Sequence, residues 1–365
     1  SRSLVGSEMC IRDRDKTLRK RNQYIPWCDP GCMSWLSELK VKKILTDSDL
    51  DGVLCGAILL RAFPDAEVKF GHPGALKDGM LDNWVDSSTA ICDLPHHTNC
   101  GLSIDHHLSN KPLENEEHSN RIWGPLPSAA RVAANLFKDR LDLSDLESAL
   151  YWTDKLDSGD ITRTEYLSDE PMVWIGRCLG VSEDVALRVL KLFSEGYGID
   201  EIVSDVLVSD AISTRKTENE ILSREIECRI EIIDRMAIVR MNDLGMRSNG
   251  YAITAFAGSD CDACMIIHGS LDGSFDNGLE YPVSASFYTN SFLHKNGGLF
   301  DLTKLATRFD ADGGGHRDAC GCRIKPLENG LPIDRRVELH DIEQNIREWL
   351  KIWNGGITNE DDVLM

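Results

Sequence analysis

The chain has 365 residues, enough for two domains that each bury a hydrophobic core. It carries 60 acidic and 40 basic residues, a net charge of −20, which argues against the broad basic surface of a protein that coats long DNA or RNA. Its longest apolar runs, such as residues 53–60, are far shorter than a membrane span, and no secretory signal is recognisable. We therefore expect a cytoplasmic protein with no membrane partner.

Twelve cysteines in a chain without a recognisable export signal indicate reduced thiols rather than a disulfide framework. Two closely spaced pairs, Cys28 with Cys32 and Cys261 with Cys264, leave a four-thiolate zinc site open. The pairs lie far apart in sequence, so we favour buried thiols.

Residues 1–40 are predicted to form an N-terminal extension. Within residues 1–14, the run LVGSEMCIRDR looks like a translated sequencing adapter and is excluded from the fold argument. Residues 15–40 are first basic and then aromatic, and no function can be inferred for them.

Residues 41–198 alternate short β-like runs with apolar helical stretches, which predicts an α/β domain with a mainly parallel sheet. Residues 53–63 are apolar on nearly every side, as in a buried helix. Ser128 precedes a second predicted helix, residues 129–138. Ser144 and Glu147 suggest a capping box for a third helix, which carries Asp154 near its end.

A long one-sided helical region over residues 199–236, with an expected break within 209–217, is predicted to connect two domains. The second domain, residues 237–346, is predicted to be a smaller α/β domain. Its expected strands are 237–241, 251–256, 265–267 and 281–288, and a helix is expected over 302–309. Residues 347–365 are expected to form a C-terminal tail that is frayed after Trp353.

Asp47, Asp49 and Asp51 stand at alternate positions directly after the apolar run 41–45. On an extended chain they would share one face and repel one another, so a bound divalent cation is the simplest explanation. A calcium loop of the EF-hand kind is excluded because Ile58 stands where that loop needs a glutamate. A solvated acidic turn is the alternative.

Two further apolar runs end in candidate ligands. One ends at Asp93, and the other ends at the triplet Asp105, His106 and His107. Acidic groups at three strand ends indicate one shared site, and its carboxylate majority favours manganese over iron, cobalt or zinc. For His96 and His97, which follow Asp93, we favour a plain loop role.

A second motif lies in the C-terminal half, where Gly313, Gly314 and Gly315 precede His316 and Arg317. Consecutive glycines expose backbone amides that suit phosphate oxygens, and the two side chains add donors. The alternative is a flexible turn between a helix and a strand.

These motifs, in this order over about residues 41–324, resemble the DHH phosphoesterase superfamily and its RecJ-like and nanoRNase-like members. The resemblance implies that two Mn²⁺ ions, or Mg²⁺ or Co²⁺, are bound by Asp47, Asp49, Asp51, Asp93, His106 and Asp154, with Asp93 bridging. Asp157 and Asp160 lie close to Asp154 in sequence and are the alternatives to it, and we favour Asp154. It further implies that Asp105 orients its neighbours, that His107 faces the substrate phosphate, and that residues 313–317 bind substrate. Two departures are Asp47, where many members have histidine, and the absence of an arginine near Ser286.

The resemblance implies a metal-dependent phosphoesterase acting on a short oligonucleotide or small nucleotide, rather than on long duplex DNA. The alternatives are a pyrophosphatase or polyphosphatase, and a non-catalytic nucleotide-binding protein. The sequence does not distinguish RNA, DNA, a cyclic dinucleotide and a bisphosphate nucleotide as substrate.

Overall fold

The structure is a computed structural model that describes residues 36, 38–113, 120–246, 248–273 and 281–361, with side chains described as far as residue 356. The chain forms two compact units. The N-terminal unit comprises the described residues up to Ile161 together with Ser168–Lys216. The C-terminal unit comprises Thr162–Leu167 and the described residues from Thr217 onward. The predicted linker, residues 199–236, is therefore divided between the two units.

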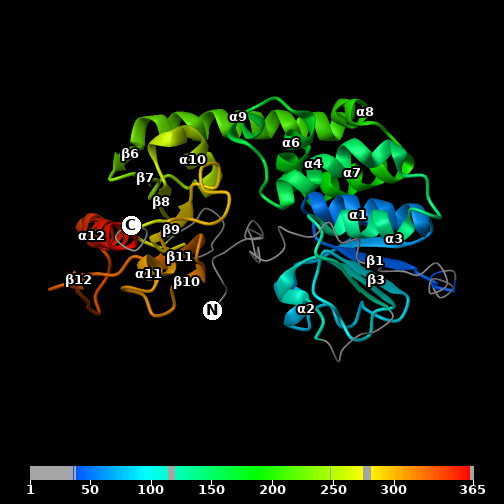
Figure 1. Ribbon diagram of the computed structural model, residues 1–365, viewed down its shortest axis with the longest axis horizontal. Coiled ribbons are helices and arrows are strands. Elements are labelled where there is room, and N and C mark those ends of the chain that lie inside the picture. The colour runs from blue at the N-terminus through cyan, green and yellow to red at the C-terminus, as the bar shows by residue number, and fades with distance from the viewer. Residues whose placement is uncertain (1–35, 37, 114–119, 247, 274–280, 362–365) are drawn as a thin grey trace. The chain divides into compact units, whose positions relative to one another are not determined.

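The N-terminal unit contains a five-stranded sheet of order β2-β1-β3-β4-β5, in which every pairing is parallel. The strands are β1 Lys43–Thr46, β2 Glu67–Phe70, β3 Thr89–Cys92, β4 Leu102–Asp105 and β5 Arg121–Trp123. Successive side chains face opposite sides, so Ile44 enters the main core while Leu45 enters a smaller cluster with Leu76 of α2, Pro73–Lys77. The prediction of a mainly parallel α/β sheet is confirmed (Figure 1).

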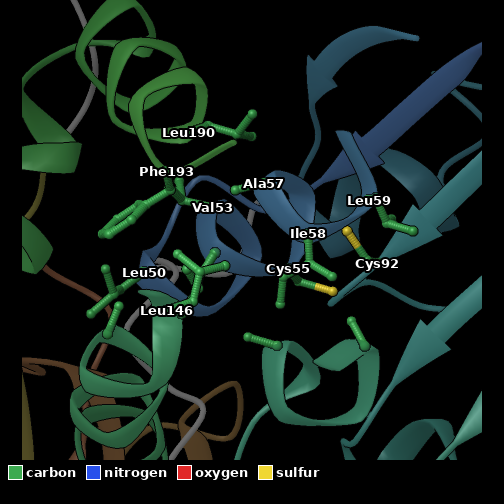
Figure 2. Packing of buried hydrophobic residues seen from close by; sticks show 14 of the residues in the cluster. Leu50, Val53, Cys55, Ala57, Ile58, Leu59, Cys92, Leu146, Leu190 and Phe193 are labelled. Carbon is green, nitrogen blue, oxygen red and sulfur yellow. The ribbon is translucent and has the colours of Figure 1, made fainter. Parts of the chain in front are cut away.

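Helix α1, Leu50–Ala62, is the centre of the main core, and its residues 50–59 are all buried. It contacts α3 Ala129–Phe137, α4 Glu147–Asp157 and α7 Glu183–Glu195. Figure 2 shows Leu190 and Phe193 of α7 beside Ala57 and Val53 of α1. Each large apolar side chain buried in this way contributes about 1.5–3 kcal/mol. The buried helix expected over residues 53–63 is thus present, and it begins three residues earlier.

The predicted helix after Ser128 is α3, and the Ser128 hydroxyl oxygen accepts from the Arg131 N–H at 3.0 Å. The capping box predicted for Ser144 and Glu147 is wrong. Residues Ser144–Leu146 form a short 3₁₀ turn instead, because Asp142 accepts from the Ser144 N–H at 3.0 Å, and α4 follows without a side-chain cap.

The helix break expected within residues 209–217 is also wrong. The chain breaks at Asp205, between α8 Ile199–Ser204 and α9 Val206–Arg229. The Asp205 side chain accepts from the Leu207 N–H at 3.2 Å and is paired with Arg188, so it starts a new helix. Helix α6, Pro171–Cys178, and the short α5, Arg163–Tyr166, complete the helices of the region before α8.

The C-terminal unit contains a six-stranded sheet of order β10-β11-β9-β8-β7-β6, in which only β7 and β8 pair in parallel. The strands are β6 Glu231–Ile233, β7 Met236–Arg240, β8 Ala263–His268, β9 Ser284–Thr289, β10 Gly314–His316 and β11 Ala319–Arg323. A small hairpin joins β12 Leu327–Glu328 to β13 Leu331–Pro332. Helices α10 Gly250–Ala257, α11 Thr303–Ala306 and α12 Leu339–Asp361 belong to this unit, together with α5 and the second half of α9 (Figure 1).

Two predictions for the C-terminal half need correction. Residues 251–256, expected as a strand, lie in α10, because the Asn249 side chain accepts from the Ala252 N–H at 3.2 Å and caps a helix. The expected tail beyond residue 346 begins inside α12, whose Trp349 and Trp353 are buried in the core beneath the sheet. No described helix is both long and apolar enough to cross a membrane.

Candidate metal centre

The parallel sheet brings three predicted site segments to one edge. Thr46 lies opposite Cys92, and Cys92 lies opposite Ile104, so the residues that follow these strand positions are neighbours. Asp93 and Asp105 are both 4% exposed. Asp93 has a φ of +56°, an uncommon and costly conformation for a non-glycine residue.

The Asp47 segment is a turn from strand to helix rather than an extended chain, which corrects the reasoning from alternate faces. Strand β1 ends at Thr46, Asp49 accepts from the Gly52 N–H at 2.9 Å as the N-cap of α1, and Asp51 lies in the first helical turn. A Cβ on Gly52 would come within 2.3 Å of the Asp47 carbonyl oxygen, so this tight turn requires glycine.

His106 lies among the carboxylates of three aspartates. Its Nε2 is 3.2 Å from Asp157, 3.5 Å from Asp51 and 3.9 Å from Asp93. Its Nδ1 is 3.1 Å from the Leu126 carbonyl oxygen, which can only accept, so Nδ1 carries the proton and the Nε2 lone pair faces the acids. Both His106 Nε2 and Asp93 Oδ1 are buried without a hydrogen-bond partner in the described structure.

Burial and mutual repulsion make these acids hard to ionise. Burial, with the charge of Asp49 second, raises the pKa of Asp47 and of Asp51 to about 7. Burial and then the neighbouring carboxylate of Asp51 raise the pKa of Asp93 and of Asp157 well above the ordinary value. Burial lowers the pKa of His106 to about 4, so this imidazole is neutral at pH 7. A neutral imidazole beside several carboxylates is the donor set of a divalent cation.

Asp51 has a second role in the fold. Its two carboxylate oxygens accept from the backbone N–H groups of Ala129 and Ala130, each at 2.7 Å, at the positive end of α3. Each carboxylate oxygen has two lone pairs, so the oxygen that faces His106 still has one to offer a cation. Asp51 therefore links α1, α3 and the candidate centre.

The structure places Asp157, rather than Asp154, beside His106. Asp154 accepts from Ser128 Oγ at 2.6 Å and pairs with Arg131 at 2.8 Å. Asp157, one helical turn later on α4, lies within a candidate metal group with Asp51 and His106. The sequence shows that Asp157 follows Asp154 by three residues. It does not show that Asp154 is already paired, because its partner Arg131 lies on another helix, α3.

Asp105 makes hydrogen bonds to His106 and His107 and does not join the cluster of candidate metal ligands. Its Oδ1 accepts from the backbone N–H of His106 at 2.7 Å, from that of His107 at 3.0 Å, and from His107 Nδ1 at 2.8 Å. This arrangement agrees with the orienting role implied for Asp105. Although His107 Nδ1 is only 3.6 Å from Asp93, it donates to Asp105, which is closer at 2.8 Å.

Residues 313–317, which are predicted to bind phosphate, are part of a hairpin in the C-terminal unit. Strand β10, Gly314–His316, pairs with β11 at the edge of the sheet. A Cβ at Gly313 would come within 2.4 Å of the Ala306 carbonyl oxygen, and one at Gly315 within 2.7 Å of that of Ala319, so both glycines are needed for close backbone approach. His316 is half-buried and Arg317 is exposed.

The other residues considered as metal ligands are two cysteine pairs and two histidines. Cys28 and Cys32 fall outside the described residues, while Cys261 and Cys264 are buried. Burial raises the pKa of Cys261 to about 11 and that of Cys264 well above its ordinary value, so both are neutral thiols. His96 and His97 lie in the loop after Asp93, and His97 Nε2 is 3.3 Å from Asp82.

No protein-family model matches this sequence. No curated protein matches it either. Among solved structures, the chain is similar to PggH of Vibrio cholerae, described as a pGpG-specific phosphodiesterase, at 19% identity and a TM-score of 0.66. That similarity covers 88% of this chain and 99% of PggH.

Two further solved structures are similar at lower scores. A DHH domain from a member of the S1P family of ribosomal proteins is 12% identical with a TM-score of 0.48, over 78% of this chain and 82% of that one. RecJ of Thermus thermophilus, in complex with Mn²⁺, is 13% identical with a TM-score of 0.47, and the match covers 88% of this chain but 54% of RecJ. Because the similarity to PggH extends over nearly the whole of both chains, this protein shares the fold of PggH.

Proposed function

We propose that this chain is a metal-dependent phosphoesterase that hydrolyses a phosphate ester of a short oligonucleotide or small nucleotide. The observation that carries the proposal is the buried pair of atoms, His106 Nε2 and Asp93 Oδ1, that have no hydrogen-bond partner in the described structure and lie among further carboxylates. Buried polar atoms without partners are costly, and a divalent cation satisfies both.

The residues that would hold one or two cations are Asp47, Asp51, Asp93, His106 and Asp157, with Asp49 at the rim of the group. When bound there, divalent cations supply Lewis acidity: they make water more acidic and neutralise charge on phosphate oxygens. The carboxylate majority favours Mn²⁺, with Mg²⁺ and Co²⁺ as alternatives.

The chain's own residues position and exchange protons. Asp105 accepts from His107 Nδ1 and so orients the His107 ring, which would face a phosphate oxygen or a leaving group of the substrate. In the C-terminal unit, His316 and Arg317 supply donors that suit the phosphate of a nucleotide.

A dinucleotide such as pGpG is the first substrate to test, because the similar structure PggH is described as acting on it. Purified full-length protein with Mn²⁺ is expected to hydrolyse at least one of pGpG, a cyclic dinucleotide, a short RNA or DNA, or adenosine bisphosphate. EDTA should abolish the turnover, and Asp93→Ala should abolish it while circular dichroism stays native.

Other outcomes would redirect the proposal. Equal turnover by the wild type and Asp93→Ala would refute the proposed activity at this centre, since the centre would then be irrelevant to the reaction. Release of phosphate from pyrophosphate alone would favour the pyrophosphatase alternative. Tight Mn²⁺ binding without turnover of any substrate in the set would favour a non-catalytic nucleotide-binding protein.

A further inference from the structure

Asp105 has a fourth donor that comes from outside its own motif. Its Oδ2 accepts from Asn110 Nδ2 at 2.6 Å, while its Oδ1 already accepts the three N–H groups of His106 and His107. The carboxylate is buried, at 4% exposure. Asn110 is therefore the donor that satisfies the oxygen of Asp105 that faces away from His107.

Asn110 is itself fixed by the neighbouring strand. It ends a short 3₁₀ turn, Leu108–Asn110, and its carbonyl oxygen accepts from Arg121 Nη2 at 2.7 Å. At the start of the turn, the His107 carbonyl oxygen accepts from Trp123 Nε1 at 2.8 Å. Two side chains of β5 thus hold both ends of the turn, and the Asn110 amide has a defined direction.

This arrangement determines which nitrogen of His107 carries a proton. Asp105 Oδ1 already accepts from two backbone N–H groups, so it also acts as the acceptor toward His107 Nδ1, which donates to it. Among the described residues, Asn110 supplies the hydrogen bond to Oδ2, so without its amide this buried oxygen would lose that donor. The carboxylate would then rotate toward other donors, and the orientation of His107 would be lost.

We propose that Asn110 is a positioning residue for the hydrolysis proposed above, acting through Asp105 on the ring orientation and tautomer of His107. The inference rests on the proposed function for its kinetic part only. Its structural part, the state of the His107 ring, is measurable without turnover.

The test uses full-length protein with the variants Asn110→Asp and Asn110→Ala. The first has the same shape and no amide donor, and the second removes the donor without adding charge next to Asp105. Asn120→Asp is the matched control, because Asn120 lies just before β5 but donates to the Cys100 carbonyl oxygen at 2.9 Å. If Asn110→Asp fails to fold, Asn110→Ala decides.

Two readouts are needed. The ¹⁵N resonances of the His107 ring, recorded with Mg²⁺ and assigned by comparison with His107→Gln, should show Nδ1 protonated in the wild type and in Asn120→Asp. In the Asn110 variants this signature should be lost. On a hydrolysed substrate, kcat should fall about 10–100-fold in the Asn110 variants, as for other orienting partners, with KM within about twofold.

Retention of kcat by both Asn110 variants would overturn the inference, as would a rise in KM at constant kcat or a loss shared by Asn120→Asp. If the wild type turns over no substrate, the proposed function fails, and the ring signature alone decides. An unchanged signature in both variants then refutes the positioning role, and a changed one supports it.

Discussion

The contrast between Asp157 and Asp154 gives the sharpest test of the candidate centre. Both lie on α4, and each is replaced by asparagine, which keeps its size and removes its charge. We expect Asp157→Asn to weaken Mn²⁺ binding without destabilising the metal-free protein. Asp154→Asn should do the reverse, because its carboxylate is occupied by Arg131 and Ser128.

The magnitudes follow from the surroundings of each carboxylate. Loss of an outer partner of a metal ligand commonly costs 10–100-fold in affinity, so loss of a ligand at Asp157 should cost about 100-fold or more. The Asp154–Arg131 pair is partly exposed, with side chains 18% and 24% accessible, so its loss should cost only about 1 kcal/mol. For a unit of this size, that lowers the melting temperature by about 2–4 °C.

The assay is a titration of each metal-free protein with Mn²⁺, followed by electron paramagnetic resonance of the free ion, and a melting curve in EDTA. The metal-free Asp157→Asn variant should be at least as stable as the wild type at pH 7.5, since the carboxylate that it loses is repelled by Asp51. Equal Mn²⁺ affinity in the wild type and Asp157→Asn, or a loss of affinity confined to Asp154→Asn, would refute the assignment.

Three further predictions concern the same chain. In EDTA, the stability contributed by Asp47 and Asp51 should fall as pH rises from about 4 to 7, because the folded state holds protons that the unfolded state has released; melting at pH 5 and 7.5 tests this, and Mn²⁺ should reverse the fall. Gly52→Ala should lose Mn²⁺ affinity, because the new Cβ would come within 2.3 Å of the Asp47 carbonyl oxygen; unchanged titration curves would contradict it. His316→Ala should reduce turnover of a nucleotide far more than that of a small aryl phosphodiester, and equal losses on both would argue against a nucleotide-binding hairpin.

The position of the candidate centre follows from the sequence because the geometry of parallel sheets is simple. Three apolar runs, each followed by acids, predict three neighbouring strands whose carboxyl ends lie together, and Asp93 and His106 are brought together in that way. The alternate spacing of the aspartates indicated the right segment for the wrong reason, since Asp49 and Asp51 belong to the start of a helix.

The choice between Asp154 and Asp157 required tertiary information. Both are acids near the end of one helix, and only the position of Arg131 on α3 shows that the first is already paired. The prediction of a strand over residues 251–256 is wrong because their aromatic and β-branched content favours a strand, whereas the Asn249 cap starts a helix. Asn110 was missed because its role depends on a hydrogen bond across a turn, which no spacing rule predicts.

The ion pair between Asp154 and Arg131 also shows why we expect the neighbouring acids to bind a cation from solution. Where this chain uses a partly buried carboxylate for structure, as at Asp154, an arginine neutralises it. Within the described part of the chain, no lysine or arginine pairs with Asp51, Asp93 or Asp157, and the imidazole of His106 among them is neutral at pH 7. Leaving several buried acids without a counter-charge costs stability at neutral pH, and a divalent ion bound there would offset that cost and supply the Lewis acidity of the proposed hydrolysis.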